Sequence, residues 1–148
     1  MNKPNPCSVL SLDIGQKRIG LAGCDPLGIT VTALPAINRG KFSQDLEIFK
    51  KYYLDRGIKG LVIGIPLDQK GLSNTQSKSC EKYGKKIAYA LKLPIALVNE
   101  HSTTWAAGEK YNLKNDRSGK LDSAAALLIL EQWLLEGPEL KPVGVASY

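Results

Sequence analysis

The sequence contains few of the residues from which zinc sites and disulfide-linked proteins are built. Its 148 residues include one histidine, His101, and three cysteines, Cys7, Cys24 and Cys80. A single histidine makes a zinc site of histidine and cysteine ligands hard to assemble. An odd number of cysteines with no C-x-x-C spacing favours a reduced, cytoplasmic protein.

Long apolar segments are also missing. The longest unbroken apolar run, 124–130, has seven residues and is too short to cross a bilayer, so we expect no membrane partner. Asp13 interrupts any signal-like stretch near the N-terminus, and secretion is not expected. No repeat, low-complexity segment or internal linker divides the chain. We therefore expect a single domain over residues 1–148, with its core at about 7–136 and loose tails at 1–6 and 137–148.

Acidic residues are outnumbered by basic ones. The chain has 14 acidic and 20 basic residues, a net charge of +6 and a pI near 9.2. This excess favours an anionic partner, nucleic acid first. One segment that holds a single acid, Glu81, contains five lysines: Lys78, Lys82, Lys85, Lys86 and Lys92. These lysines are either the solvated face of a helix or contacts to a phosphate backbone.

The hydrophobic pattern alternates between the periods of strands and of helices. Strands are predicted at 8–14, 18–24, 30–37, 61–65 and 94–99, the first three forming an antiparallel meander. Helices are predicted at 43–56, 73–91, 103–113 and 121–135, the second capped by Ser73 and Gln76. This order predicts an α/β domain with a mixed five-stranded sheet flanked by helices on both faces.

Three acids stand at the ends of predicted elements. Asp13 closes the first strand, Glu100 directly follows the last strand, and Asp122 opens the last helix. Because the first strand of such a sheet is usually central, the ends of two parallel strands can meet in a crevice. Carboxylates from different elements can bind Mg²⁺ or Mn²⁺. Two such ions about 4 Å apart activate a water and stabilise the leaving oxygen of a phosphodiester.

Each of these acids also has a purely structural interpretation. Asp13 could end a strand, Glu100 could be a solvated loop residue, and Asp122 could be a helix N-cap. The helix face that Asp122 begins continues through apolar positions: Ala125 or Ala126, Ile129 and Trp133. Because such a face packs inward, we expect the Asp122 carboxylate to point toward the sheet.

Four sequence blocks identify a family resemblance. The first block, L-D-I-G-Q-K-R-I-G-L-A from Leu12, reads as a tight hairpin whose backbone can approach a phosphate or a metal. The others are I-G-I-P-L-D-Q-K-G from Ile63, N-E-H-S-T-T from Asn99 and K-L-D-S-A-A-A-L-L-I-L from Lys120. In this order they resemble the YqgF family, which is associated with Holliday junction resolution and with nuclease processing of precursor ribosomal RNA on an RNase H-like fold.

The resemblance implies a metal-dependent nuclease that hydrolyses phosphodiester bonds. Asp13, Glu100 and Asp122 would be its catalytic and metal-binding carboxylates, with Mg²⁺ or Mn²⁺ as the cofactor. Its implied substrate is structured nucleic acid, most of all precursor 16S ribosomal RNA at its 5′ end, with ribosomal particles as a further partner in the cytoplasm.

Contacts to nucleic acid are expected from the hairpin, the strand end and the second helix. The candidate residues are Lys17, Arg18, Ser73, His101, Lys78, Lys82, Lys85 and Lys86. A helix N-terminus such as the one after Ser73 suits a phosphate backbone. His101 departs from the family pattern, which usually has arginine there. A neutral histidine cannot hold a phosphate through two parallel hydrogen bonds.

Three other functions remain open from the sequence. A DNA endonuclease resembling Holliday junction resolvases would need a dimer to cut two strands symmetrically. A non-catalytic RNA-binding module could keep the same fold, and the histidine at position 101 mildly favours it. The hairpin from Asp13 to Gly20 also resembles the phosphate loop of actin-like and sugar-kinase domains. Those enzymes clamp ATP between two such domains, whereas this chain has the length of one.

Overall fold

The computed structural model describes residues 4–67, 70–100 and 120–144. Five strands are described: β1 (Val9–Ile14), β2 (Arg18–Cys24), β3 (Val31–Asn38), β4 (Gly60–Pro66) and β5 (Ile95–Glu100). The described helices are α1 (Phe42–Arg56), α2 (Thr75–Leu91) and α4 (Lys120–Glu136). The predicted helix at 103–113 and the candidate residue His101 lie outside the described residues.

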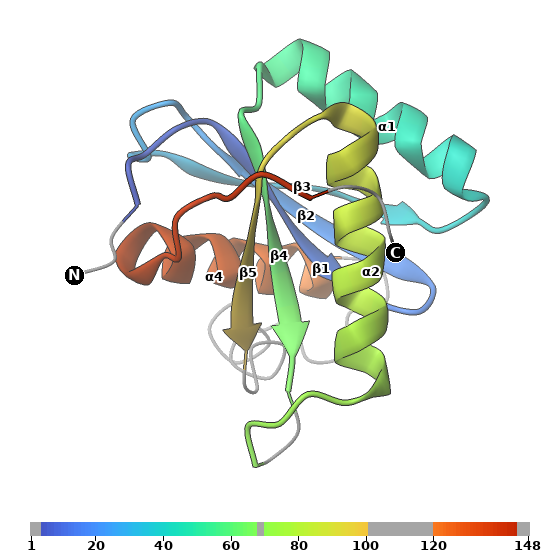
Figure 1. Cartoon of the computed structure of the whole chain (residues 1–148). Helices are drawn as coiled ribbons and strands as arrows, with labels where there is room; N and C mark the ends of the chain where they lie inside the picture. Colours follow the sequence, from blue (N-terminus) through green and yellow to red (C-terminus); the bar gives the residue numbers. More distant parts are fainter. Residues whose placement is uncertain (1–3, 68–69, 101–119, 145–148) are drawn as a thin grey trace.

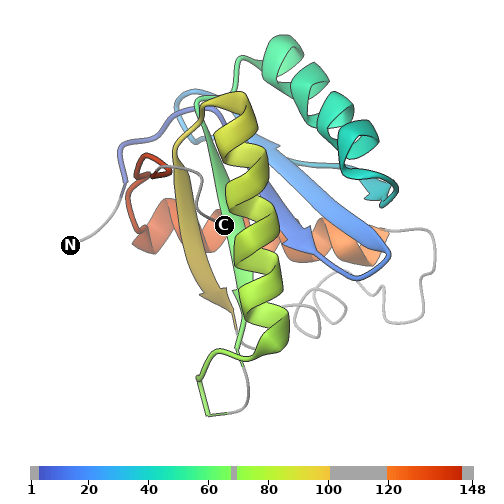
Figure 2. The same ribbon diagram turned by 45° about the vertical axis from the view of Figure 1, so that its right-hand side comes forward.

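The strands form one mixed sheet in the order β3-β2-β1-β4-β5. β1 pairs antiparallel with β2 and parallel with β4, while β5 continues the parallel part at one edge. β2 and β3 complete the antiparallel meander. The predicted five-stranded mixed sheet and its central first strand are therefore confirmed. Figures 1 and 2 show that β1, β4 and β5 run in the same direction, so that their carboxyl ends lie at one edge.

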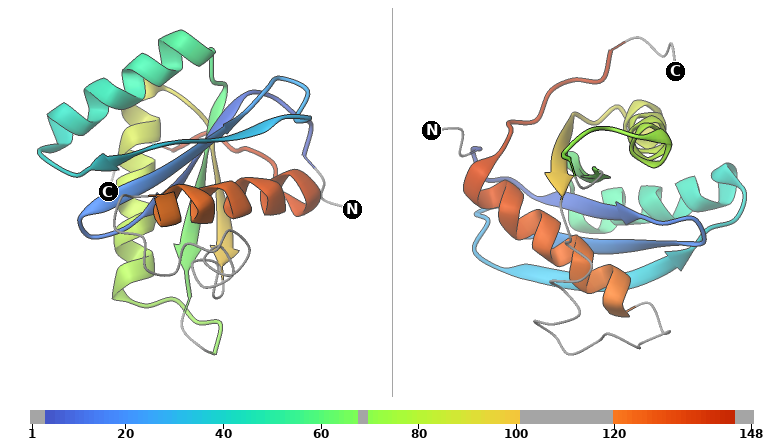
Figure 3. Two further views of the ribbon diagram at one scale, coloured as in Figure 1. Left: turned by 180° about the vertical axis from the view of Figure 1, so that it is seen from behind. Right: turned by 90° about the horizontal axis from the view of Figure 1, so that it is seen from below.

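Helices cover both faces of the sheet, as predicted (Figure 3). One core packs α1 and α2 on the sheet, and the other packs α4 on the opposite face. The side chains of β1 alternate between these cores. Leu10 and Leu12 lie in the core of α1 and α2, whereas Val9 lies in the core of α4 and Ser11 donates its hydroxyl to the Ala126 carbonyl at 2.8 Å. Because side chains alternate along a strand, Asp13 lies on the α4 face together with Val9 and Ser11.

The face of α4 that begins at Asp122 packs inward, as the sequence predicts. Ala125, Ala126, Ile129 and Trp133 are fully buried. The helix begins at Lys120, however, so Asp122 lies inside its first turn. The interpretation of Asp122 as the N-cap is therefore wrong, because an N-cap residue flanks the helix rather than belonging to it.

The N-cap of α2 lies one residue after the predicted one. Asn74, not Ser73, is the N-cap, and its side chain accepts a hydrogen bond from the Ser77 backbone N–H at 2.9 Å. The Asn74 backbone N–H in turn donates to the Ser77 hydroxyl at 2.6 Å. The predicted capping box of Ser73 and Gln76 is thus replaced by Asn74 and Ser77, since asparagine caps a helix as well as serine does.

The C-terminal segment contacts the rest of the domain. Ile95 and Lys141 exchange two backbone hydrogen bonds of 2.9 Å, and Trp133 Nε1 donates to the Pro138 carbonyl at 2.6 Å. Val143 packs against the core of α1 and α2. The segment that was expected to be a loose tail therefore contacts β5 and α4 at these residues. Among the helices described, none is long and apolar enough to span a membrane.

Candidate active site

A tight hairpin presents Asp13 at the end of β1. Asp13 pairs with Gly20 across the hairpin, and the Gly15 N–H donates to the Arg18 carbonyl at 2.9 Å to close the turn. A Cβ atom at Gly15 would come within 2.8 Å of that same carbonyl oxygen. The turn therefore requires glycine, and this requirement explains the glycine two residues after the acid.

Glycines occupy the sheet positions on both sides of Asp13. Gly20 is its partner on β2. Leu12 of β1 pairs with Ile63 of β4, and Gly64 is therefore the β4 residue opposite Asp13. These two positions carry no side chain on the face that Asp13 shares with α4. The missing side chains leave space there for groups from other elements.

The two other predicted acids occupy that space. A Cβ atom at Gly20 would overlap the backbone carbonyl oxygen of Asp122, and one at Gly64 would lie 3.2 Å from Oε1 of Glu100. Gly20 thus lets the first turn of α4 approach the sheet, while Gly64 makes room for the side chain of Ile129 and for the Glu100 carboxylate.

Glu100 is the last residue of β5 and is only 8% exposed. The interpretation of this residue as a solvated loop residue is therefore wrong. Its strand neighbour on the same face, Val98, is buried in the core of α4. A carboxylate that is buried at the end of a parallel strand is costly unless a cation or hydrogen-bond donors stabilise it.

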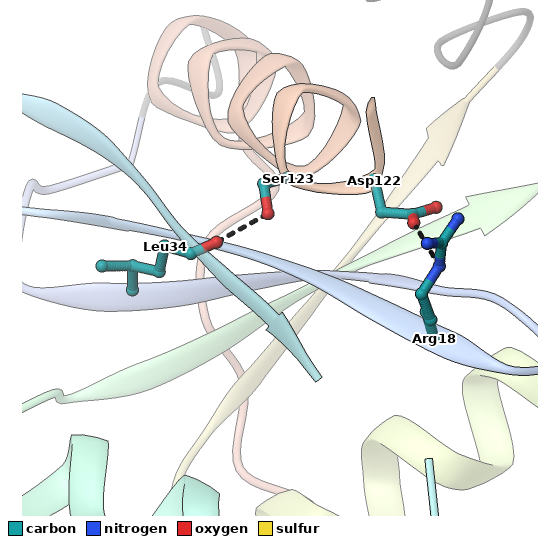
Figure 4. Close-up of polar contacts among 4 residues, drawn as sticks. All are labelled: Arg18, Leu34, Asp122 and Ser123. Atoms are coloured by element: carbon teal, nitrogen blue, oxygen red, sulfur yellow. Dashed lines mark hydrogen bonds and ion pairs between the residues drawn. The ribbon is translucent and has the colours of Figure 1, made fainter. Parts of the chain in front are cut away.

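Asp122 lies in the first turn of α4 and faces the hairpin. Its Oδ2 lies 3.1 Å from Nε of Arg18, and the two side chains are 24% and 34% exposed. Figure 4 shows this pair, and beside it Ser123, whose hydroxyl donates to the Leu34 carbonyl of β3 at 2.6 Å. The first turn of α4 is thereby fixed to both β2 and β3. The Asp122 carboxylate points toward the sheet, as its helix face predicts.

The charges of the three acids act on one another. Burial, followed by the negative charges of Glu100 and Asp122, raises the pKa of Asp13 to about 8. A carboxyl group is perturbed in this way when like charges lie close by in a poorly solvated place. The three predicted acids therefore gather around the end of β1. Within the described residues, no three histidine, cysteine, aspartate or glutamate side chains are already arranged to hold a metal ion. Metal binding by these acids stays a prediction.

The predicted nucleic-acid contacts are spread over a wider surface. Lys17 is exposed at the tip of the hairpin, and Ser73 is exposed just before α2. The four lysines of α2 differ. Lys78 and Lys82 are exposed, whereas Lys85 is paired with Glu81 at 2.7 Å and Nζ of Lys86 lies 4.2 Å above the Phe42 ring. These lysines belong to α2, which covers the face of the sheet opposite to α4.

Sequence reasoning missed one residue at the hairpin, Arg39. Its Nη1 donates to the Gly15 carbonyl at 2.7 Å, and its backbone N–H donates to the Lys17 carbonyl at 2.8 Å. Arg39 directly follows β3 and belongs to none of the four sequence blocks. A contact across 24 positions of the chain leaves no local spacing that could have revealed it.

Cavity size alone does not locate the site. A cavity of about 630 Å³ lies at the carboxyl end of α2, where Tyr89, Leu93 and Val143 contribute to its wall. None of the described residues that line it is an acid, and they include the carboxyl end of α2, which lies away from the hairpin (Figure 1). The gathered acids, rather than this cavity, therefore mark the candidate active site.

Comparison with known proteins agrees with the four sequence blocks. The family model of RuvX, described as a Holliday junction resolvase, matches residues 7–136. A relative from Prochlorococcus marinus (strain MIT 9313) is 62% identical over 146 residues, which cover 99% of this chain and 91% of that protein. One from Parasynechococcus marenigrum (strain WH8102) is 62% identical over 140 residues, covering 95% and 89%. Both carry the provisional name pre-16S rRNA nuclease.

Solved structures extend the comparison to the fold. RuvC from Thermus thermophilus, in complex with a Holliday junction substrate, aligns with a TM-score of 0.54 and 13% identity over 92% of this chain and 99% of that one. A second structure of RuvC from Thermus thermophilus gives a TM-score of 0.53 and 12% identity, with 91% and 99% covered. At such low identity the likeness concerns the fold, which is RNase H-like. The family match and the close relatives together show that this chain belongs to the RuvX (YqgF) family of nucleases.

Proposed function

We propose that this chain is a divalent-metal-dependent nuclease that matures the 5′ end of precursor 16S ribosomal RNA. The observation that carries the proposal is the placement of Asp122 and Glu100 against Gly20 and Gly64, the residues that flank Asp13 in the sheet. The net charge of +6 suits a polyanionic substrate. The provisional names of the relatives point to precursor ribosomal RNA as that substrate. Such a substrate implies a cytoplasmic protein that meets precursor ribosomal particles.

The residues at the site fit a hard divalent cation. Three carboxylates provide the oxygen ligands that Mg²⁺ and Mn²⁺ prefer. Gly20 and Gly64 allow the first turn of α4 and the Glu100 carboxylate to lie close to the strands beside Asp13. Asp13, Glu100 and Asp122 would hold such a cation, which would supply activation of a water and stabilisation of the leaving oxygen of a phosphodiester. Burial is the main cause of the raised pKa of Asp13, and the negative charges of Glu100 and Asp122 add to it; a bound cation would offset that added repulsion.

The basic residues of the hairpin would hold the substrate. Arg18 lies beside Asp122, and its guanidinium matches the geometry of a phosphate. Lys17 is exposed one residue away and supplies a second positive charge. These side chains position a phosphodiester over the carboxylates, which is where hydrolysis requires it.

The proposal is tested by cleavage of two substrates under three metal conditions. A precursor 16S RNA fragment and a four-way DNA junction are incubated with Mg²⁺, with Mn²⁺ or with EDTA. We expect metal-dependent cleavage of the RNA, abolished in Asp13→Asn and Glu100→Gln. The exposed residue Lys59, at the amino end of β4, gives the control variant Lys59→Gln, which should cleave like the wild type.

The four-way DNA junction is included in this test because the matching family is described as Holliday junction resolvases. Cleavage of the junction alone would assign the chain to that activity. Binding of RNA without cleavage under any metal condition would instead indicate a non-catalytic RNA-binding module and overturn the proposal.

A further inference from the structure

A second cavity lies on the other side of the hairpin from the acids. It has a volume of about 330 Å³ and is lined by Arg39, by residues 14–16 of the hairpin and by Thr75, Gln76, Ser79 and Cys80 of α2. We propose that this cavity is a phosphate subsite, in which Arg39 binds a backbone phosphate next to the one that is cleaved. The inference rests on the proposed nuclease function, and it assigns to Arg39 a role that the four sequence blocks do not.

The position of Arg39 is fixed by the surrounding structure. Its Nη1 donates to the Gly15 carbonyl at 2.7 Å, and its guanidinium carbon lies 4.4 Å from the centre of the Tyr83 ring. The Tyr83 hydroxyl donates to Oδ2 of the buried Asp45 at 2.9 Å. A guanidinium stacked on an aromatic ring in this way loses little further freedom on binding a phosphate.

Arg39 forms no ion pair with any acid in the described part of the chain. The acid of its own network, Asp45, accepts with one oxygen from the Tyr83 hydroxyl and with the other from the Gly40 N–H at 3.0 Å. Arg39 therefore brings to the cavity wall a half-buried positive charge that forms no ion pair with an acid of the described residues.

The cavity adjoins the acids through one strand end. Ile14 and Gly15 line it and directly follow Asp13 in the chain. The Cys80 thiol, which also lines it, lies 3.4 Å from the Ile14 carbonyl. Burial, followed by the charges of Asp13 and Glu100, raises the pKa of this thiol to about 11, while Arg39 acts in the opposite direction. A nucleic-acid strand that crosses the end of β1 would thus meet the acids on one face and Arg39 on the other.

The test measures binding without cleavage. Affinity for a fluorescein-labelled RNA hairpin is determined in EDTA at several salt concentrations, for the wild type and four variants. Arg39→Gln removes the cation, and Gln76→Glu adds an acid to the cavity wall while Arg39 and the hairpin stay intact. A glutamate in the first turn of α2 suits the helix dipole, so this variant should fold normally. Lys59→Gln is the control, since all three substitutions lower the net charge by one.

We expect Arg39→Gln and Gln76→Glu to bind the RNA several-fold more weakly than Lys59→Gln. The slope of log affinity against log salt should become shallower by about 0.7 to 0.9, the value for one lost phosphate contact. Arg39→Lys, which keeps the charge, should recover much of this slope.

Two results would overturn the subsite. In the first, both cavity variants bind like Lys59→Gln. In the second, Arg39→Gln weakens binding while Gln76→Glu does not, which would mean that Arg39 only supports the hairpin. Failure of the proposed nuclease function looks different. In that case, wild-type RNA binding and its dependence on Arg39 persist, but no metal condition gives cleavage.

Discussion

Arg18 and Asp122 form an ion pair that links the hairpin to the first turn of α4, with Nε and Oδ2 3.1 Å apart. Both side chains are partly exposed, at 34% and 24%, so solvent screens the pair and its contribution to stability is small. The acid of this ion pair, Asp122, is one of the three carboxylates that we assign to the metal. Arg18 and a divalent cation therefore compete for Asp122.

This competition predicts the effect of removing Arg18. In the absence of nucleic acid, Arg18→Gln should bind Mn²⁺ several-fold more tightly than the wild type, because Asp122 no longer has a cationic partner. Isothermal titration calorimetry measures the difference, with Lys59→Gln as the control for the loss of one positive charge. An unchanged or weaker affinity in Arg18→Gln would show that the ion pair does not oppose metal binding.

The raised pKa of Asp13 predicts how stability depends on pH. The group titrates at about 8 in the folded protein and near 3.8 when unperturbed. Between these values the folded state keeps a proton that the unfolded state releases. The metal-free protein should therefore lose stability as the pH rises from about 4 to about 8. Melting temperatures in EDTA should show this fall for the wild type and a clearly smaller one for Asp13→Asn. Parallel curves for the two proteins would exclude Asp13 as its source.

The space beside Asp13 predicts the effect of a single methyl group. In Gly64→Ala the new Cβ would meet the side chain of Ile129 and lie 3.2 Å from Oε1 of Glu100. Displacement of these groups should cost about 1–3 kcal/mol of stability, as overpacking does, and should reduce cleavage well beyond that loss of folded protein. Gly144→Ala is the matched control, since nothing lies within 4 Å of a Cβ atom there. Denaturant unfolding and cleavage rates that match between the two variants would contradict the assigned role of Gly64.

The buried carboxylate of Asp45 predicts that removal of the Tyr83 hydroxyl destabilises the protein. Asp45 is 2% exposed and accepts a hydrogen bond from Tyr83, whose pKa is raised mainly by burial and then by this acid. Tyr83→Phe should lower the free energy of unfolding by about 1–3 kcal/mol, because it takes a donor from a buried acceptor. Tyr53→Phe, at a residue that is 39% exposed, should change it little. Equal urea denaturation midpoints for the two variants would argue against the network around Arg39.

The sequence predicted the parts of the structure that depend on local pattern. The predicted ends of the first and last strands placed Asp13 and Glu100, and the apolar face of the last helix oriented Asp122. Contacts between distant segments left no such pattern. The contact of Arg39 with Gly15 spans 24 positions, and the bridge between Ile95 and Lys141 was equally invisible.

Local competition explains the errors at the helix ends. Ser73 and Asn74 are both good N-cap residues, and the backbone selected the second. Asp122 reads as a cap in the sequence because acids are common there, yet α4 begins two residues earlier. Choices of this kind are decided by how the whole helix packs, which a short sequence window does not contain.

The most direct test of the metal-dependent site compares the wild type with Asp122→Asn. Cleavage of the precursor 16S RNA fragment is measured with Mg²⁺ and with EDTA, and melting curves are recorded for both proteins. Asparagine keeps the shape of the side chain but removes the charge that a Mg²⁺ site requires. We predict that the wild type cleaves only with Mg²⁺, and that Asp122→Asn loses cleavage with little change in melting temperature. Full activity of Asp122→Asn, or wild-type cleavage in EDTA, would contradict the account.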